Sequence, residues 1–358
     1  MTKYFGSPLY LCIAFSIFVP YNRIYKFKIY LKGAIMTKIK FLLLFSVLIL
    51  SSIAALNFGS SSYNIFDILN AFISSADSGL KNIIINVRIP RLLLSILVGA
   101  NLAVSGVLLQ SVMQNPLADP GLTGVSTGAS LVALVIMLLF PDHLFWISFI
   151  AFIGGTISCM AVIVISVKNG KIKPIRIILG GVAVNAFLSS FISLLFIIFS
   201  DQLQGALLWL NGSFSGRGWH HIKILFPITI IGLSLSIFSY KDANLLQLGD
   251  KVASNLGINP SVKRIKLVLI ACFLTGISVA NVGLISFVGL VVPHISRLIV
   301  GTNHLFLIPF SAVMGSVLML LADTAARNLF SPFDIPVGIV TSAIGIPFFL
   351  FLLRTKEN

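Results

Sequence analysis

Long apolar runs recur along almost the whole chain, and they constrain the fold more than any other feature of the sequence. A helix needs about 20 consecutive apolar residues to cross a bilayer core roughly 30 Å thick. Of 358 residues, 57% are hydrophobic and only 10% are charged, whereas about a quarter of the residues of soluble domains are charged. The sequence therefore predicts an all-α polytopic membrane protein with about ten transmembrane helices, some of them broken or re-entrant.

The expected spans lie between the breaks in this apolar pattern. A break within a span, as at Gly283, Gly289 and Pro293, is tolerated at membrane depth where neighbouring protein satisfies the freed backbone groups. Residues 36–358 are expected to form one transmembrane domain. Its spans are Ile39–Leu56, Leu92–Met113, Thr123–Phe140, Leu144–Val167, Ile177–Phe199, Ile222–Tyr240, Leu267–Val282, Leu284–Val300, Leu305–Phe330 and Ile335–Leu353.

Residues 1–35 do not fit this pattern. The apolar run Leu9–Val19 is too short to span comfortably, and Tyr21–Lys32 is basic and aromatic. Met36, followed by two lysines and then an apolar run, resembles the usual start of a membrane protein. One interpretation is that translation begins at Met36 and that 1–35 is an over-long gene assignment; the alternative is a helix lying on the membrane surface.

The basic residues are distributed very unevenly between the two sides of the membrane. The 25 Lys and Arg exceed the 10 Asp and Glu, an excess that would suggest nucleic-acid binding in a soluble protein. Sorted by alternate loops, nineteen lie on the side of the N-terminal segment and six on the other side. Because short cytoplasmic loops are rich in Lys and Arg, both termini are expected to be cytoplasmic, and no nucleic-acid partner is expected. The six outer residues are Lys81, Arg88, Arg91, Arg217, Lys223 and Arg327.

The sequence carries no recognisable catalytic or cofactor motif. It has no phosphate-binding G-x-x-x-x-G-K-[ST] loop, and no pair of carboxylates lies near membrane depth to act as acid and base. The five histidines show no H-E-x-x-H spacing, and Cys12, Cys159 and Cys272 are interpreted as isolated, small buried hydrophobes. We therefore expect no catalytic residue, no cofactor and no metal site in this chain.

Acidic residues are almost absent from the expected spans. Asp323 lies well inside one and precedes Arg327 by four residues, so the two side chains share a helix face and can form an ion pair. An ion-coupled carrier would normally place unpaired ionisable groups near the midplane. The pattern thus favours energy supplied by a separate subunit, with an ion-coupled secondary carrier and a membrane-embedded enzyme as weaker alternatives.

The segment 243–260 joins the sixth and seventh spans on the cytoplasmic side. Its apolar residues follow near-helical spacing, and Gly249 and Gly257 are expected to end two short helices. Such a segment could insert into a partner protein or lie on the membrane, but its polar face is not strongly basic, which weakens the membrane interpretation. The apolar residues are Leu245, Leu248, Val252 and Leu256.

Several long motifs, in order, resemble the FecCD-type permeases of ABC importers for iron complexes and cobalamin. They are Arg88-Ile-Pro-Arg91, Asn115-Pro-Leu-Ala-Asp119 with the glycine-rich residues up to Ala129, Gly283-Leu-Ile-Ser-Phe-Val-Gly289 continuing to Arg297, Leu321-Ala-Asp-Thr-Ala-Ala-Arg327, and Ile335-Pro-Val-Gly338 continuing to Pro347. The resemblance extends from about Ile39 to Leu353.

This resemblance implies a ten-helix permease of the bacterial cytoplasmic membrane, embedded in lipid. It would work as a homodimer or beside a paralogous permease, with two ATPase subunits that bind the ATP and an extracytoplasmic substrate-binding lipoprotein. The cargo it implies is an iron complex, foremost a ferric siderophore, then haem and then cobalamin. The outer loop Asn211–Trp219 is more similar to the iron–siderophore permeases than to the cobalamin permease.

The resemblance also implies roles for particular residues. Arg88, Arg91 and Arg327 would receive carboxylates of the binding protein, a role that suits the planar guanidinium; interfacial snorkelling is the alternative. Asn115 and Leu117 would narrow the cytoplasmic gate, and the opposing loop would be Lys173-Pro-Ile175, which lacks the small hydroxyl residues of the cobalamin permease. The residues implied to couple the permease to the ATPase are Leu245, Leu248, Gly249, Val252, Ala253, Leu256 and Gly257.

Small residues at helical spacing indicate close packing between helices. Gly99, Ala103 and Gly106 lie on one face of the expected second span, and Gly124 and Gly128 form a G-x-x-x-G pair. Such positions let two helix backbones approach each other closely. We assign these residues a packing role and no role in substrate binding.

Overall fold

The computed structural model describes residues 21–58, 78–329 and 333–355. The chain divides into two compact units, Met1–Ser46 and Val47–Asn358. Helix α2 (Tyr21–Asn57) begins in the first unit and ends in the second, so that Met36 lies inside a continuous helix. Residues 1–20 lie outside the described residues, and a start of translation at Met36 stays a prediction.

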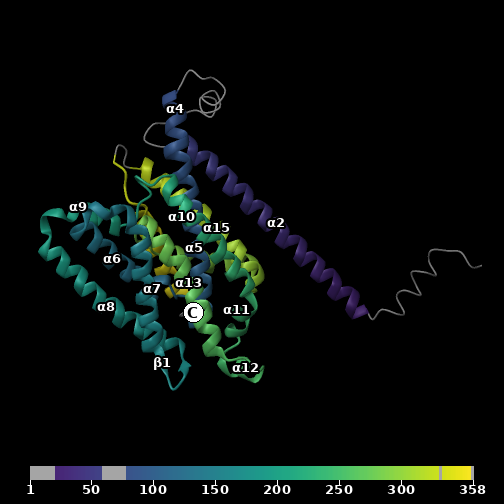
Figure 1. Cartoon of the computed structure of the whole chain (residues 1–358). Coiled ribbons are helices and arrows are strands. Elements are labelled where there is room, and N and C mark those ends of the chain that lie inside the picture. Colours follow the sequence, from purple (N-terminus) through teal and green to yellow (C-terminus); the bar gives the residue numbers. More distant parts are fainter. Residues whose placement is uncertain (1–20, 59–77, 330–332, 356–358) are drawn as a thin grey trace, which may run out of the picture. The chain divides into compact units, whose positions relative to one another are not determined.

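The second unit is built almost entirely from helices (Figure 1). A short β-hairpin, β1 (Val167–Lys168) paired antiparallel with β2 (Lys171–Ile172), joins α7 to α8. The helices after α2 are α4 (Ser78–Ile83), α5 (Ile89–Met113), α6 (Val125–Leu139), α7 (Ile147–Ser166), α8 (Pro174–Ile198), α9 (Leu203–Leu210), α10 (Trp219–Phe238), α11 (Tyr240–Gln247), α12 (Asp250–Asn255), α13 (Pro260–Val282), α14 (Val288–Val300), α15 (His304–Asn328) and α16 (Val337–Thr355), with a π-helical turn at Ile84–Arg88 and 3-10 turns at Pro120–Thr123, Pro141–Trp146 and Ser200–Gln202.

Helices that could span a membrane correspond one to one with the expected spans. Within the described residues, seven helices are long and apolar enough to cross a bilayer, and three shorter apolar helices, Val125–Leu139, Val288–Val300 and Val337–Leu352, complete the series. The predicted fold class is confirmed. The boundaries differ by a few residues at most ends; the largest difference is at the second span, which begins at Gly79 instead of Leu92.

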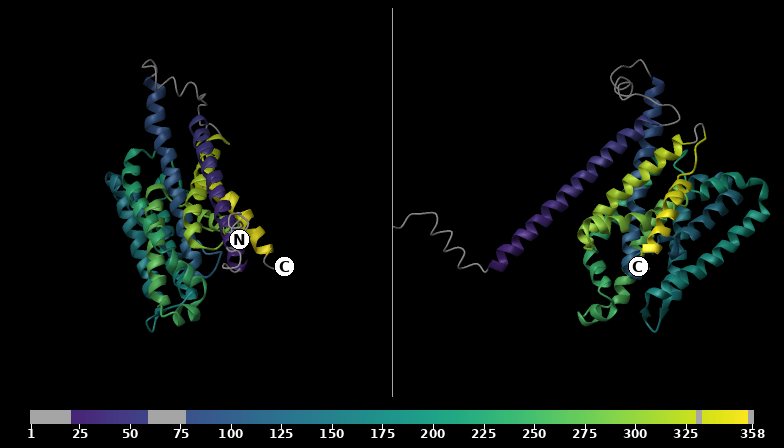
Figure 2. Two further views of the ribbon diagram at one scale, coloured as in Figure 1. Left: turned by 90° about the vertical axis from the view of Figure 1, so that its right-hand side faces the viewer. Right: turned by 180° about the vertical axis from the view of Figure 1, so that it is seen from behind.

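Helix α5 lies at the centre of the packing in the second unit. It contacts α10, α13, α14 and α15 and is buried along most of its length (Figures 1 and 2). Two glycines allow this: a Cβ on Gly99 would lie 2.2 Å from the Gly315 carbonyl oxygen, and one on Gly106 would lie 1.9 Å from that of Gly289. The close backbone approach predicted from the spacing of small residues is confirmed.

The expected broken helix lies between α13 and α14. Gly283 adopts a φ of +81°, and a Cβ there would lie 1.9 Å from the Trp209 carbonyl oxygen, so that only glycine fits. The Val282 carbonyl, which the break leaves without a helical partner, accepts a hydrogen bond from the Ser213 backbone N–H at 2.8 Å. Neighbouring protein thus satisfies the freed backbone group, as an interruption at membrane depth requires.

The extent of the break differs from the prediction. Gly289 and Pro293, which were expected to interrupt the span, lie inside α14, and this helix begins at Val288 instead of Leu284. Pro293 occupies the second turn of α14, and the Gly289 carbonyl, which receives no proline N–H, accepts a hydrogen bond from Gln110 Nε2 at 3.3 Å. The sequence pattern alone does not distinguish a proline near a helix start from one that breaks a helix.

Two of the three cysteines meet in the core. The thiol of Cys159 in α7 lies 2.7 Å from the sulfur of Cys272 in α13, and both side chains are buried. Their interpretation as buried small side chains is confirmed, but they are neighbours and not isolated thiols. Cys12 lies outside the described residues.

Candidate functional site

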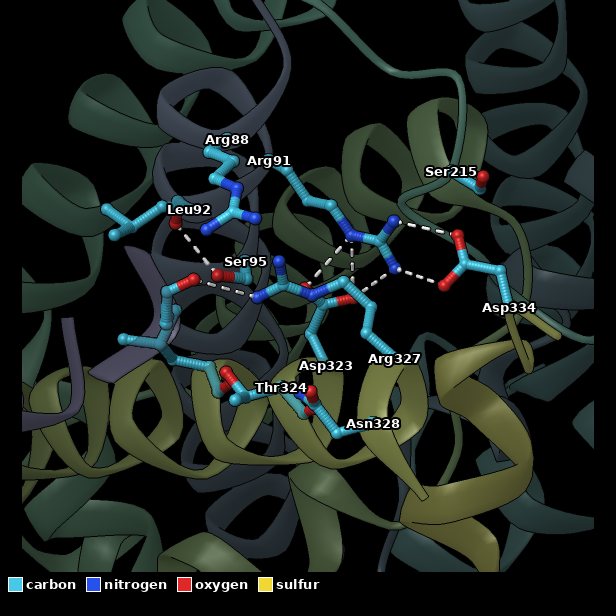
Figure 3. Close-up of polar contacts among 12 residues, drawn as sticks. Arg88, Arg91, Leu92, Ser95, Ser215, Asp323, Thr324, Arg327, Asn328 and Asp334 are labelled. Carbon is cyan, nitrogen blue, oxygen red and sulfur yellow. Dashed lines mark hydrogen bonds and ion pairs between the residues drawn. The ribbon is translucent and has the colours of Figure 1, made fainter. Parts of the chain in front are cut away.

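The three predicted docking residues meet at one end of the second unit. Arg88 ends the π-helical turn, Arg91 lies in the first turn of α5, and Arg327 lies in the last turn of α15; Figure 3 shows their side chains gathered in one cluster. They line a cavity of about 690 Å3 that also contains Arg217 and Asp334. The sequence placed all four arginines on one side of the membrane, and the structure brings them to one cavity.

Two aspartates bind this arginine cluster from below and from the side (Figure 3). Asp323, only 1% exposed, accepts hydrogen bonds from Arg91 Nε at 3.0 Å and Nη2 at 2.9 Å, and forms an ion pair with Arg327 Nε at 3.3 Å. Asp334 accepts from Arg91 Nη1 at 2.9 Å. The predicted pair of Asp323 with Arg327 is therefore present, and Arg91 shares it.

Arg88 and Arg327 also bind backbone carbonyls at the end of α2. Arg88 Nη1 donates to the carbonyls of Leu56 and, at 3.3 Å, of Asn57, while Arg327 Nη2 donates to the Ala55 carbonyl at 3.2 Å. Cations are favoured at a helix C-terminus because its last carbonyls have no helical partner and carry partial negative charge. The cluster thus holds α2, α5 and α15 together at this end.

The cavity remains positively charged after this internal pairing, because four arginines face two aspartates. Burial acts to raise the pKa of the Asp334 carboxyl, but the hydrogen bonds and charge of Arg91 outweigh it and lower the pKa below its ordinary value. Burial lowers the pKa of the Arg217 guanidinium, whose Nη1 lies 3.4 Å from His221 Nε2. Chemically, this end offers planar cationic groups to a carboxylate brought by another molecule.

The opposite end carries the segment predicted to couple to a partner. Helices α11 and α12 are two short helices, as expected, separated at Gly249, where φ is +91°, and followed by Gly257, where φ is +77°. Leu248 and Leu256 are 57% and 58% exposed, and Val252 is also exposed. Three apolar side chains therefore face outward from a short polar segment, as in surfaces that bind another protein.

Two other apolar residues predicted to couple do not present their side chains to a partner. Ala253 is buried and Leu245 is half-buried; Leu246, which the sequence analysis left out, is fully buried. One face of a short helix packs against the rest of the protein. Apolar spacing alone therefore does not distinguish the residues of that buried face from the exposed ones. Only Leu248, Val252 and Leu256 of this set present apolar surface to a partner.

Ion pairs fix this segment to α13. Asp242 accepts from Lys263 at 2.8 Å and from Lys266 at 2.9 Å, and Asp250 is bound by Arg264. Burial acts to raise the pKa of Asp242, but the hydrogen bonds of the two lysines lower it below its ordinary value. The hydrogen bond from Arg264 does the same for the pKa of Asp250.

The predicted gate residues lie in the loop after α5. Asn115 makes a local turn, with its side-chain oxygen accepting from the Leu117 backbone N–H at 3.0 Å, and both residues are half-buried. The opposing loop, Lys173-Pro-Ile175, follows the hairpin β1–β2 and opens α8. Arg264 donates to the Val112 carbonyl at 3.2 Å and to the Ile172 carbonyl at 3.0 Å, so the residues that lead into the two loops are neighbours in space.

The described residues offer no assembled metal site. In residues 21–58, 78–329 and 333–355, no group of three or more His, Cys, Asp or Glu side chains is arranged to hold a metal ion. His304, which is buried, instead lies 2.5 Å from Ser111 and 2.7 Å from Asn244 through its two ring nitrogens. The absence of a cofactor stays a prediction.

Comparison with known proteins decides the family. The profile of the FecCD transport family matches residues 47–355, nearly all of the second unit. The chain belongs to the FecCD transport family. The Fe(3+)-citrate import system permease protein YfmD of Bacillus subtilis is 38% identical over 303 residues, covering 85% of this chain and 90% of that protein. The hemin transport system permease protein HmuU of Yersinia pestis is 36% identical over 335 residues, covering 92% and 99%.

A solved structure agrees with this FecCD assignment. An ABC transporter assigned to the metal-chelate type, in an inward-facing conformation, matches with a TM-score of 0.78 and 31% sequence identity. The match covers 89% of this chain and 99% of that chain. The chain is thus a multi-pass permease of the FecCD family.

Sequence reasoning missed several residues of both ends of this FecCD protein. Asp334 and Arg217 lie in the arginine-lined cavity, and Arg264, Asp250 and Gln114 form the polar contacts behind the coupling segment. Except for Arg217, each is at least 14 residues from its side-chain hydrogen-bond partners, so no local spacing pairs them. The one available signal was Arg264 itself, the fifth residue of a helix that is mostly apolar from Leu267 onward.

Proposed function

We propose that this chain is the transmembrane permease subunit of an ATP-binding-cassette importer that carries an iron complex, foremost a ferric siderophore, into the cytoplasm. The observation that carries the proposal is the nearly full-length match to an Fe(3+)-citrate import permease. Haem is the second candidate cargo, because the hemin transport permease matches almost from end to end. Cobalamin is the third, on the motif resemblance.

In this proposal the energy comes from ATPase subunits bound at the coupling end. The exposed side chains of Leu248, Val252 and Leu256 supply the apolar contact surface, and ion pairs to α13 keep the segment in place. Closure of the ATPases on ATP would move α11 and α12 and switch the pathway between outward-open and inward-open states. With the coupling end cytoplasmic, both chain termini are cytoplasmic as well.

At the other end, a substrate-binding lipoprotein would deliver the cargo to the arginine-lined cavity. Carboxylates of that protein fit the planar guanidinium groups, and the net positive charge of the cavity favours them. Arg91 already binds Asp323 and Asp334, so its role in docking is shared with a structural one. Arg88 and Arg327 share their docking role with structural contacts in the same way, to carbonyls of α2 and, for Arg327, to Asp323. Arg217, which lines the same cavity, joins the three predicted docking residues.

Uptake by whole cells tests the cargo. Radiolabelled iron is supplied to a deletion strain and to the same strain carrying this chain, as ferric citrate, as ferric hydroxamate, as a ferric catecholate or as haem, with labelled cobalamin in parallel. We expect one of the iron chelates to enter only when the chain is present, and to stop entering when the ATPase gene is deleted. Equal uptake of every iron compound with and without the chain would refute the iron assignment. Uptake that persists without the ATPase and collapses with an ionophore would indicate a secondary carrier.

A matched pair of charge reversals tests the docking surface. Arg88→Glu is expected to abolish uptake without affecting membrane insertion or ATPase assembly. The new carboxylate lies where a carboxylate of the binding protein is proposed to bind, and the two repel each other. Lys81→Glu, an exposed residue seven positions earlier, makes the same change in charge away from the cavity and is expected to leave uptake intact. If both variants transport like the wild type, the cavity is not the docking surface.

A further inference from the structure

Among the residues that the structure describes, Arg264 is the largest completely buried side chain. It lies near the start of α13, and its guanidinium donates hydrogen bonds to three separate parts of the chain. These are the Val112 carbonyl at 3.2 Å from Nε, the Ile172 carbonyl at 3.0 Å from Nη1, and the carboxylate of Asp250, at 2.8 Å from Nη1 and again from Nη2. A buried guanidinium is retained in a fold only when such partners satisfy it.

One partner belongs to the coupling segment, and the other two lie in the elements that lead into the two loops predicted as gates. Asp250 is the first residue of α12. Val112 lies in the last turn of α5, directly before the loop of Asn115 and Leu117. Ile172 ends the hairpin that leads into the opposing loop, and its backbone N–H donates to Ser261 of α13 at 3.1 Å.

Gln114 makes a second connection between the same segments. It ends α5 in a left-handed conformation with φ of 49°, immediately before Asn115. Its side-chain amide donates to the Leu246 carbonyl of α11 at 2.8 Å and to Asp250 Oδ1 at 3.3 Å. The residue that precedes the predicted gate is thus hydrogen-bonded to both helices of the coupling segment.

We propose that Arg264 and Gln114 are positioning residues that transmit movement of α11–α12 to the cytoplasmic gate. A guanidinium is planar and holds its donors at fixed angles, so a displacement of Asp250 moves the hydrogen bonds to Val112 and Ile172 together. A lysine would keep the charge at this position without the fork that reaches three partners. This inference rests on the proposed function, because the movement must come from an ATPase bound to α11–α12.

The test compares transport with ATP hydrolysis in the complete transporter. Permease, ATPase and binding protein are reconstituted in proteoliposomes, and the substrate delivered per ATP hydrolysed is measured for wild type, Arg264→Lys and Gln114→Ala. We expect the ratio to fall about 2- to 30-fold in Arg264→Lys, the range in which residues along a coupling route alter coupling, and by less in Gln114→Ala. A purely structural role would lower transport and hydrolysis in parallel and leave the ratio unchanged.

Lys266→Gln is the matched control. Lys266 lies on the same helix and also forms an ion pair with the coupling segment, at 2.9 Å to Asp242, but its ion pair touches neither gate loop. The inference is supported if the ratio falls in Arg264→Lys and Gln114→Ala but not in Lys266→Gln, and it is overturned if all three ratios equal that of the wild type or fall alike. If Arg264→Lys fails to assemble, Gln114→Ala, whose side chain is exposed, decides in the same way. A wild-type permease that binds no ATPase would overturn the proposed function first and this inference with it.

Discussion

Replacing Asp323 by Asn is expected to destabilise the permease more than any other single change in the arginine cluster. Asp323 is 1% exposed and binds two arginines. Without its charge, Arg91 keeps only the carboxylate of Asp334, and Arg327 loses its ion pair within α15. Removing one partner of a buried ion pair costs about 3–5 kcal/mol, because the remaining charge stays buried without compensation. Asn preserves the shape of the side chain, so the change measures charge and not packing.

The midpoint of thermal unfolding measures this effect. A free energy of about 3–5 kcal/mol, at roughly 2–4 °C per kcal/mol in larger domains, predicts a fall of at least about 6 °C. A thiol-reactive fluorogenic probe reports unfolding here, because Cys159 and Cys272 are buried in the folded protein; Cys12 is replaced by Ser in every variant. Asp334→Asn is the control: the Asp334 side chain is 40% exposed, and exposed pairs contribute about 1 kcal/mol or less. Equal midpoints for Asp323→Asn and Asp334→Asn would refute the reasoning.

Three further predictions concern packing, pH and docking. Gly106→Ala puts a Cβ 1.9 Å from a carbonyl oxygen and is expected to cost about 1–3 kcal/mol of stability in the same unfolding assay, whereas Gly205→Ala, whose Cβ would have its nearest neighbour at 3.8 Å, is expected to cost nothing. Asp242 and Asp250 have pKa values below the ordinary value of an aspartate, so their ion pairs stabilise the folded state above about pH 4. This stabilisation is lost as the pH falls through the lowered pKa values. The unfolding midpoint of Asp250→Asn should therefore depend less on pH between about 5 and 3 than that of the wild type. Asp334→Asn is expected to bind the substrate-binding protein more tightly, because Asp334 competes with that protein's carboxylates for Arg91. An affinity equal to or below that of the wild type in a pull-down titration would contradict this.

The sequence predicted the helices well and the ion pairs poorly, for one physical reason. A span, a small-residue face or the pair Asp323–Arg327 is a local pattern, so hydropathy and helical spacing suffice to find it. The ion pair of Arg91 with Asp323 joins residues 232 positions apart, and the hydrogen bond from Arg264 to the Ile172 carbonyl joins residues 92 positions apart. Such contacts depend on which helices pack against each other, and hydropathy does not encode that choice.

Lysines and arginines differ in role in this chain: the type of basic residue, and not only its side of the membrane, distinguishes residues that orient the protein from residues proposed to bind partners. Among the residues whose burial the structure describes, every buried Lys or Arg is an arginine: Arg88, Arg91 and Arg264. The lysines are exposed or half-buried, as a strongly hydrated ammonium at a membrane surface requires. Lysines can therefore account for much of the charge asymmetry that orients the protein, whereas buried arginines mark the two ends at which partners are proposed to bind. A guanidinium can satisfy carbonyls and carboxylates from several segments at once, and at both ends of the bundle it does so.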